Sequence, residues 1–424
     1  MRRTAIVLAG VQWLLFMFAN TVVIPLSVGA AFHLSSALIM TTLRLSFMYT
    51  GLACILQAVI GHRYPVLEGQ AGLWWGVILS LSGSAVAAHL SLTQLGGGLA
   101  TGIMLSGVSV AVLGALGMGK LLQRLFTPVI MSVFLFLLGT QLLIIFAKGM
   151  LGLSNGASIN LPVAALSVCL VVLVACLTVK GRGPLRNFAI LLGIVVGWIV
   201  FVLLFPQHTV WVAQPGPLLN WFPWGTPNWD LGIVLTAYLT GLINTANTVV
   251  SLRGMEPICG EAVNDAKYRR SFVLTGFNTF VAGTLGLVPY APYTSSLGFL
   301  QVTGILDRAP FILGGVMFVG LGMMPTLGSF FATLPISVGD AVLFVAYLQL
   351  IGAALRQLEG IGFNPQQVYR YALPLLSGIV IMSLPAQAFN SLPMLARPLV
   401  SNGLLMGIIL ALILDNVVSW ERIR

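Results

Sequence analysis

Apolar residues form a series of long runs along the chain, separated by short stretches of proline, glycine and polar residues. A helix that crosses a membrane needs roughly 20 mostly apolar residues. The runs meet this length repeatedly, and they predict an all-α membrane protein of about 14 transmembrane segments. The expected spans are 6–28, 38–60, 66–86, 98–117, 127–147, 160–179, 186–206, 231–252, 272–289, 294–306, 310–325, 328–352, 371–387 and 398–418.

The composition supports a membrane protein and excludes several other classes. Of the 424 residues, 58% are hydrophobic and only 7% are charged, with a mean hydropathy of +1.01. Such a chain has too few charges to cover a soluble surface. The net charge of +10 would suggest a nucleic-acid partner in a soluble protein, but Lys and Arg also collect on the cytoplasmic side of membrane proteins. We therefore expect a lipid bilayer as the partner and no nucleic acid.

The basic residues also orient the chain. When both termini are placed in the cytoplasm, all but three of the 20 Lys and Arg residues fall on the inner side. The exceptions are Lys148 and Arg397 outside, and Arg44 within a span. The segment 207–230 then lies outside with Trp211, Trp221, Trp224 and Trp229, which fit an interfacial belt, although a binding role is the alternative.

The chain contains an internal repeat. The pentapeptide Ala-Asn-Thr-Val-Val occurs at 19–23 and again at 246–250, an offset of 227 that also aligns Pro65 with Pro292 and Glu68 with Ser295. The segments 128–141 and 335–349 resemble each other at a second offset. Seven spans per half would invert the second half, giving the 7+7 inverted repeat of many secondary transporters. A duplicated channel or membrane enzyme could share this symmetry.

Two segments combine proline, glycine and small polar residues before a short apolar run. In both 65–72 and 289–298 we expect extended backbone that leads into a half-helix with unpaired N–H groups. Such groups suit a planar solute rich in hydrogen-bond acceptors. Two kinked helices with packing glycines are the alternative. The candidate solute-binding residues are Gly69, Gln70, Ala71, Gly72, Asn244, Thr248, Thr294, Ser295 and Ser296.

Polar side chains inside spans are functional candidates. Asn244 and Thr248 share a helix face in the eighth span, where they either join helices or meet the solute. A charge in a span costs at least about 2.5–3.5 kcal/mol. Glu68 is the candidate for proton coupling, with a structural pairing to Arg44 as the alternative, while Asp340 lies away from the repeated segments. The four cysteines show no metal or disulfide spacing, and no cofactor or enzymatic site is expected.

These features resemble the nucleobase–cation symporter-2 family, also called nucleobase–ascorbate transporters, and within it the purine-permease subgroup of enteric bacteria. The resemblance covers nearly the whole chain and is strongest at 10–25, 68–76, 268–272 and 397–403. Of the family's tenth-span signature, Gly298, Thr303 and Gly304 fit, while Ser295 and Ser296 depart from it. Asn244 stands where the family usually has a base-binding carboxylate, and Trp13 follows Gln12 where a histidine is usual.

The resemblance implies a fold and a function. It implies a core domain at 6–120 and 231–325 that moves against a gate domain at 125–206 and 326–420. It further implies secondary active transport of a nucleobase, in particular a purine, across the bacterial inner membrane, with protons as coupling ion and a possible homodimer. A carrier of another small anion or ring solute on the same fold is the alternative.

Overall fold

The chain is almost entirely helical, which confirms the expected all-α fold. The structure, a computed structural model, describes residues 3–87, 90–153, 158–181, 188–206, 217–362 and 364–418. Among these residues, seven helices are long and apolar enough to cross a membrane by length and composition, and four shorter apolar helices accompany them. The count of 14 spans stays a prediction. Several residues used to orient the chain lie outside the described residues, namely Arg2, Arg182, Arg186, Trp211, Arg422 and Arg424.

The chain forms two compact units, the first comprising Met1–Gln70, Leu142–Asn220 and Tyr293–Leu348. The first unit contains helices α1 (Arg3–Thr21), α2 (Val23–Ala31), α3 (Ser36–Val59), α8 (Leu161–Lys180), α10 (Ala189–Leu204), α13 (Ser295–Thr303), α14 (Arg308–Met323) and α15 (Pro325–Ala332), and strand β1 (Glu68–Gln70). Two helices, α7 (Pro128–Met150) and α16 (Ile336–Arg356), have residues in both units.

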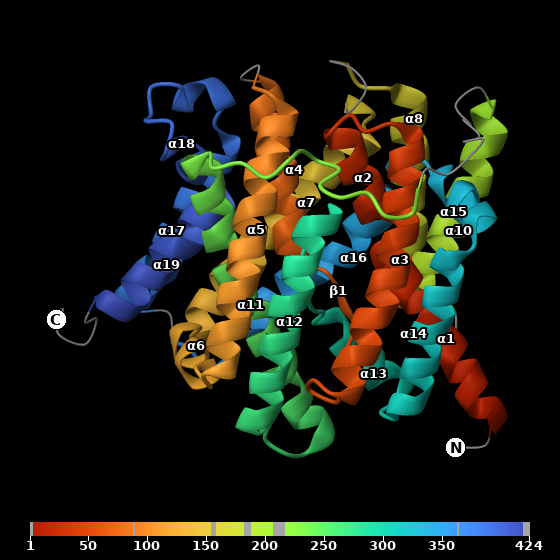
Figure 1. Cartoon of the computed structure of the whole chain (residues 1–424), viewed down its shortest axis with the longest axis horizontal. Coiled ribbons are helices and arrows are strands. Elements are labelled where there is room, and N and C mark those ends of the chain that lie inside the picture. The colour runs from red at the N-terminus through yellow and green to blue at the C-terminus, as the bar shows by residue number, and fades with distance from the viewer. Residues whose placement is uncertain are drawn as a thin grey trace. The chain divides into compact units, whose positions relative to one another are not determined.

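The second unit comprises Ala71–Gln141, Trp221–Pro292 and Gln349–Arg424. Its elements are α4 (Gly72–Ala87), α5 (Leu92–Ala115), α6 (Gly119–Leu125), α11 (Leu231–Cys259), α12 (Asp265–Leu285), strand β2 (Tyr290–Pro292), α17 (Pro365–Ser383), the 3₁₀ turn η3 (Ala386–Phe389), α18 (Arg397–Val400) and α19 (Gly403–Val417). Figure 1 shows α17 and α19, and likewise α5 and α12, running side by side.

Polar N-cap residues explain where many helices begin. In each case a side-chain oxygen accepts a hydrogen bond from a backbone N–H of the first turn, which a helix leaves without an internal partner. The capping residues are Ser35, Ser91, Asn160, Asp230, Asn264, Asn364 and Asn402. The sequence thus specifies these helix starts locally, even where the apolar run alone did not locate them.

Several of the expected spans are divided, among them 6–28, which contains most of α1 and the start of α2. The run 328–352 is split between α15 and α16, because Pro335 cannot continue the helical hydrogen bonding and restricts the residue before it. The run 398–418 is split between α18 and α19, where Asn402 caps the second helix. Helices α5 and α12 begin six and seven residues earlier than the expected spans, at the caps Ser91 and Asn264.

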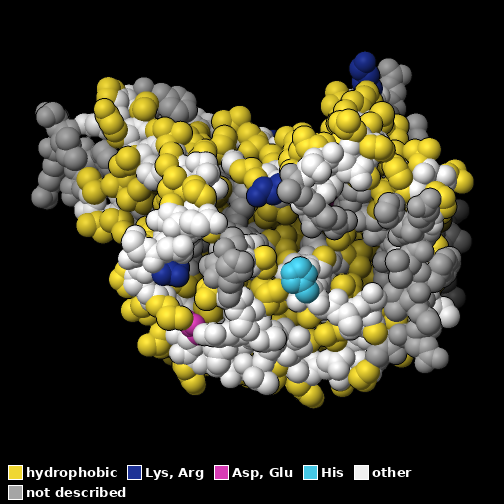
Figure 2. Space-filling view, turned by 90° about the horizontal axis from the view of Figure 1, so that it is seen from above, with side chains coloured by type: hydrophobic (Ala, Val, Ile, Leu, Met, Phe, Trp, Pro, Cys, Tyr) yellow, Lys and Arg dark blue, Asp and Glu magenta, His cyan; other side chains and the backbone are white. Residues whose placement is uncertain are grey.

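Glycines allow close helix packing inside each unit. In the first unit, a Cβ on Gly51 of α3 would lie 2.5 Å from the carbonyl oxygen of Gly315 in α14. In the second, a Cβ on Gly276 of α12 would lie 2.6 Å from the carbonyl oxygen of Gly107 in α5. Small residues at such crossings are typical of helices packed within a membrane. Among the described residues on the face in Figure 2, hydrophobic side chains are widespread and charged ones are few.

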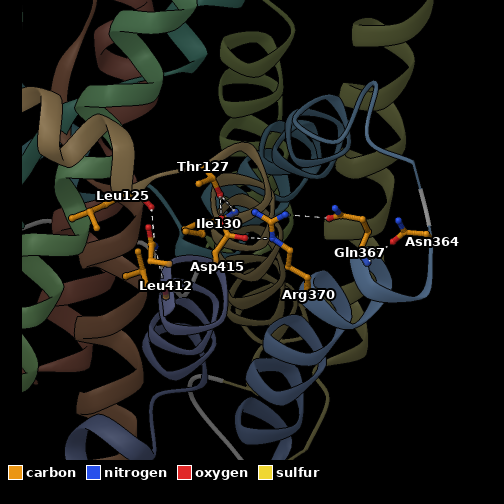
Figure 3. Close-up of polar contacts among 9 residues, drawn as sticks. Leu125, Thr127, Ile130, Asn364, Gln367, Arg370, Leu412 and Asp415 are labelled. Carbon is orange, nitrogen blue, oxygen red and sulfur yellow. Dashed lines mark hydrogen bonds and ion pairs between the residues drawn. The ribbon is translucent and has the colours of Figure 1, made fainter. Parts of the chain in front are cut away.

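A buried ionic cluster ties three helices of the second unit together (Figure 3). The Asp415 carboxylate of α19 accepts hydrogen bonds from Arg370 Nε in α17 and from the hydroxyl of Thr127, which precedes α7. The Asp415 side chain is 1% exposed, whereas that of Arg370 is 22% exposed. Arg370 also donates to Gln367 one turn earlier. Because the Asp415 side chain is buried, removal of one partner would leave the other without its counter-charge, and this is the costly change at a buried pair.

Candidate functional site

The first candidate segment is an extended strand followed by a helix, as the sequence predicted. Residues 65–67 are irregular, β1 covers Glu68–Gln70, and α4 begins at Gly72. The second segment has the same order, with β2 at Tyr290–Pro292 and α13 from Ser295. Proline explains both extended approaches, because it lacks an N–H group and disfavours helix at the residue before it.

In the first unit, β1 and the residue before it are held by the approach to α13. The Leu67 N–H donates to the hydroxyl of Ser296 at 3.0 Å, and the Leu67 carbonyl accepts from the Tyr293 N–H at 2.8 Å. The Tyr293 hydroxyl donates to the Gln70 carbonyl oxygen. A Cβ on Gly69 would lie only 3.1 Å from the Tyr293 ring, so the ring approaches the strand closely where Gly69 has no side chain. The approach to α13 therefore anchors β1.

The side chains of β1 face α3 in the same unit. Gln70 is buried, and its amide donates to the hydroxyl of Ser46 at 3.1 Å, while its Oε1 has no donor among the described residues. Glu68 is buried, and its backbone N–H and carbonyl both contact the thiol of Cys54, at 3.3 and 3.5 Å. The structure therefore brings Glu68, Gly69 and Gln70 together with Ser296.

The three polar residues at the start of α13, Thr294, Ser295 and Ser296, differ in burial and in hydrogen bonding. Ser296 is buried and bonded to the strand, whereas Ser295 is exposed and Thr294 is half-buried. The N–H groups of Ser296 and Leu297 bond to the carbonyls of Tyr293 and Thr294, so a turn satisfies part of the helix start. Among the described residues, the N–H groups of Thr294 and Ser295 have no acceptor.

In the second unit, the start of α4 carries unsatisfied donors. Ala71 donates its N–H to the Pro289 carbonyl at 2.8 Å. The next three N–H groups, on Gly72, Leu73 and Trp74, have no acceptor in the described part of the chain. These are the orphan donors of a helix N-terminus, and the helix dipole adds partial positive charge there. The Ala71 N–H is thus already bonded. Backbone N–H groups are available to an acceptor-rich solute only from Gly72 onward.

One face of α11 supports β2 in the same unit. The Asn244 amide donates to the Tyr290 carbonyl at 3.1 Å, and its Oδ1 accepts from the amide of Asn247 at 2.9 Å. Ser251, two turns further along, donates to the Pro292 carbonyl at 2.9 Å. Between them, the buried hydroxyl of Thr248 has no partner among the described residues. Asn244 is thus engaged with the strand, while Thr248 remains available.

Three residues near this region were not expected from the sequence. Ser251 continues the face of Asn244 and Thr248 at helical spacing, so the same periodicity could have identified it. Gln141 of α7 donates to the Gly76 carbonyl of α4 at 2.9 Å, and its Oε1 has no donor in the described chain. The indole N–H of Trp74 is also buried without an acceptor there. Only the tertiary structure identifies these last two.

The ionisable candidates in the first unit have separate surroundings. The Arg44 guanidinium donates to the carbonyls of Gly322 and Met323, both at 3.2 Å, and the alternative pairing of Arg44 with Glu68 stays a prediction. A helix C-terminus offers carbonyls without internal partners, which explains why Arg44 binds the end of α14. The carboxylate of Asp340 is buried against Gly149, where a Cβ would lie 1.7 Å from Oδ2.

The sequence of the chain is similar to those of several permeases. Residues 4–387 match the family model Xan_ur_permease, described as "Permease family". The Bacillus subtilis protein named "Putative purine permease YwdJ" is 27% identical to this chain. The alignment covers 98% of this chain and 97% of YwdJ. The xanthine permease of Bacillus subtilis is 22% identical, over 96% of this chain and 92% of its own.

A solved structure shares the fold. The transmembrane domain of the cyanobacterial bicarbonate transporter BicA superimposes with a TM-score of 0.63 over 98% of each chain, at 13% sequence identity. Transporters of this structural class have a 7+7 inverted repeat. At this identity the likeness concerns the fold alone, and the ligand of each transporter depends on the residues at its own site.

Proposed function

Because the chain belongs to the Xan_ur_permease family of permeases, the nucleobase–cation symporter-2 family expected from its motifs, we propose that it carries a purine base across the inner membrane together with protons. It is a transporter and not an enzyme. The relative named for xanthine supports a nucleobase as the solute. Proton coupling, the choice of a purine and the inner-membrane location are part of the proposal.

One observation carries the proposal beyond the family match: the N–H groups of Gly72, Leu73 and Trp74 have no acceptor among the described residues. Purine bases present carbonyl oxygens and ring nitrogens in one plane. Backbone N–H groups at a helix start bind such acceptors without any side-chain charge. This fits a chain in which Asn244 replaces the usual carboxylate. In our proposal the base is bound by these N–H groups and by the hydroxyl of Thr248, while Asn244 positions Tyr290.

A substitution at the start of α4 tests this use of the backbone. Proline is well tolerated at the first helical position, because its missing N–H needs no intrahelical acceptor there. Gly72→Pro should therefore remove one donor and lower base affinity about tenfold, the effect of one net hydrogen bond, with little change in melting temperature. Gly119→Pro, at the first residue of α6, is the matched control and should leave affinity unchanged.

Uptake assays in cells without other base permeases test the solute. Labelled xanthine, uric acid, hypoxanthine and uracil would be compared with bicarbonate and sulfate, which the fold likeness alone would equally allow. Accumulation of a purine that a protonophore abolishes is the expected result. Uptake of an inorganic anion and no base would overturn the proposal.

Glu68 is the proposed proton acceptor, supported by its complete burial on β1. Glu68→Gln should keep base binding, measured as a thermal shift, and lose proton-driven accumulation. Unchanged coupling at normal expression would remove Glu68 from the mechanism.

We further propose movement of a core domain (6–120, 231–325) against a gate domain (125–206, 326–420), and a homodimer. Mass measurement of the purified protein in detergent tests the dimer.

A further inference from the structure

A groove in the second unit has the chemistry of a lipid site. It is lined by α4, α5, the start of α11 and the segment 386–401, and it encloses about 70 Å³, or about 650 Å³ with its open mouth included. Leu81, Ala85, Phe389 and Met394 form much of its apolar wall.

Two opposite charges line this groove without pairing. The Arg397 guanidinium donates through Nη2 to the carbonyl oxygens of Asn390 and Leu392, at 2.6 and 3.4 Å, while its buried Nε has no acceptor among the described residues. Asp230 caps α11 through the N–H of Ile233 and accepts from the amide of Gln94 at 3.1 Å. Within the described chain no ion pair joins Arg397 to Asp230.

The position of the groove suggests the source of its ligand. Trp229, directly before Asp230, is 70% exposed, and exposed tryptophans mark the depth of lipid headgroups. The polar end of the groove therefore lies where headgroups lie, and its apolar wall continues along α4. A ligand that satisfies all three features has an anion for Arg397, a cation with N–H donors for Asp230, and an acyl chain.

We propose that this groove binds a phospholipid with a primary ammonium headgroup, of the phosphatidylethanolamine class. The phosphate accepts charge-assisted hydrogen bonds from Arg397, and the ammonium donates to Asp230. The acyl chain lies against Leu81 and Phe389. A choline headgroup offers Asp230 no N–H, and a glycerol headgroup offers it no cation, so the groove discriminates among the three headgroups.

The test uses the full-length protein, purified in detergent and stripped of lipid. Phosphatidylethanolamine, phosphatidylcholine and phosphatidylglycerol with identical acyl chains would be added at equal concentration. Bound lipid is counted by native mass spectrometry, and melting temperature is recorded alongside. We expect phosphatidylethanolamine to bind at least about tenfold more tightly than the other two, as loss of one charge-assisted hydrogen bond predicts. Glycerophosphoethanolamine, which lacks acyl chains, should bind more weakly.

Variants assign the effect to the groove. Asp230→Asn keeps a good N-cap and should abolish the preference for phosphatidylethanolamine over phosphatidylcholine. Arg397→Lys should retain binding, and Arg397→Gln should weaken all three lipids. Ser84→Phe should fill the groove and exclude lipid with both charges intact. Lys180→Gln, on α8, is the control cation and should change nothing.

Equal binding of the three lipids in the unmodified protein would overturn the proposal. So would an undiminished preference in both Asp230→Asn and Ser84→Phe. If Arg397→Gln does not fold, Asp230→Asn and Ser84→Phe still test whether the groove binds the lipid. None of these results depends on which solute is transported.

Discussion

The side-chain amide of Asn244 on α11 donates a hydrogen bond to the carbonyl oxygen of Tyr290, 46 residues away, at 3.1 Å. The Asn244 oxygen is at the same time occupied by the amide of Asn247. Asn244, which stands where the resemblance implies a carboxylate, is here bonded to the backbone of β2. A carboxylate could not make this bond, because it has no proton to donate.

Restoring the carboxylate should therefore destabilise the protein. Asn244→Asp has nearly the same shape but places an acceptor against the Tyr290 carbonyl. We expect a loss of about 1–3 kcal/mol, the cost of a buried group left without its partner, and a lower melting temperature. Asn364→Asp, at the exposed N-cap of α17, keeps the oxygen that accepts from the Gln367 N–H, so it is the control and should be close to neutral. An unchanged melting temperature for Asn244→Asp would show that the bond to Tyr290 does not stabilise the fold.

Thr248→Val should separate solute binding from folding. The buried hydroxyl of Thr248 has no partner among the described residues, so its removal leaves no group unsatisfied and should not lower the melting temperature. If the hydroxyl binds the base, affinity falls about tenfold. Thr240→Val on the same helix removes a hydroxyl that donates to the Thr236 carbonyl, and should leave base affinity unchanged. Equal affinity in the protein and its Thr248→Val variant would remove Thr248 from the site.

Gly276→Ala should disrupt the packing of α12 on α5. Its Cβ would lie 2.4 Å from the backbone nitrogen of Ala111 and 2.6 Å from the Gly107 carbonyl, and backbone atoms cannot move aside as a flexible side chain can. Overpacking of this kind costs typically about 1–3 kcal/mol. Gly320→Ala on α14 has no atom within 4 Å of the new Cβ and is the matched control. Thermal unfolding measures both, and similar melting temperatures would contradict the close crossing.

Asp415→Asn should be strongly destabilising. The substitution leaves the Arg370 guanidinium facing a neutral group in a cluster where Asp415 is 1% exposed. Breaking a buried pair from one side costs about 3–5 kcal/mol, with the lower end expected because Arg370 is partly exposed. Glu261→Gln breaks the pair with Lys267, in which Glu261 is 67% exposed, and should cost at most about 1 kcal/mol. Comparable unfolding temperatures for the two variants would refute a structural role for the cluster in Figure 3.

The sequence by itself determined the membrane class, the all-α fold and the two extended segments before α4 and α13. These features depend on local properties: the length of apolar runs, the lack of an N–H in proline, and polar residues that cap helix starts. Local signals also placed Asn244 and Thr248 on one helix face. The run 328–352 shows the limit of such prediction. Its apolar residues continue past Pro335, whereas the helix is interrupted there.

The tertiary structure alone decided which polar groups are already bonded. Ser296 reaches Leu67 across 229 positions, and Arg44 reaches Gly322 across 278, so neither bond has a local signature. A buried polar side chain must find a partner, but its residue type does not say whether that partner is protein or solute. Asn244 and Thr248 illustrate the difference: four residues apart on one helix, the first supports a strand and the second keeps its hydroxyl unbonded among the described residues.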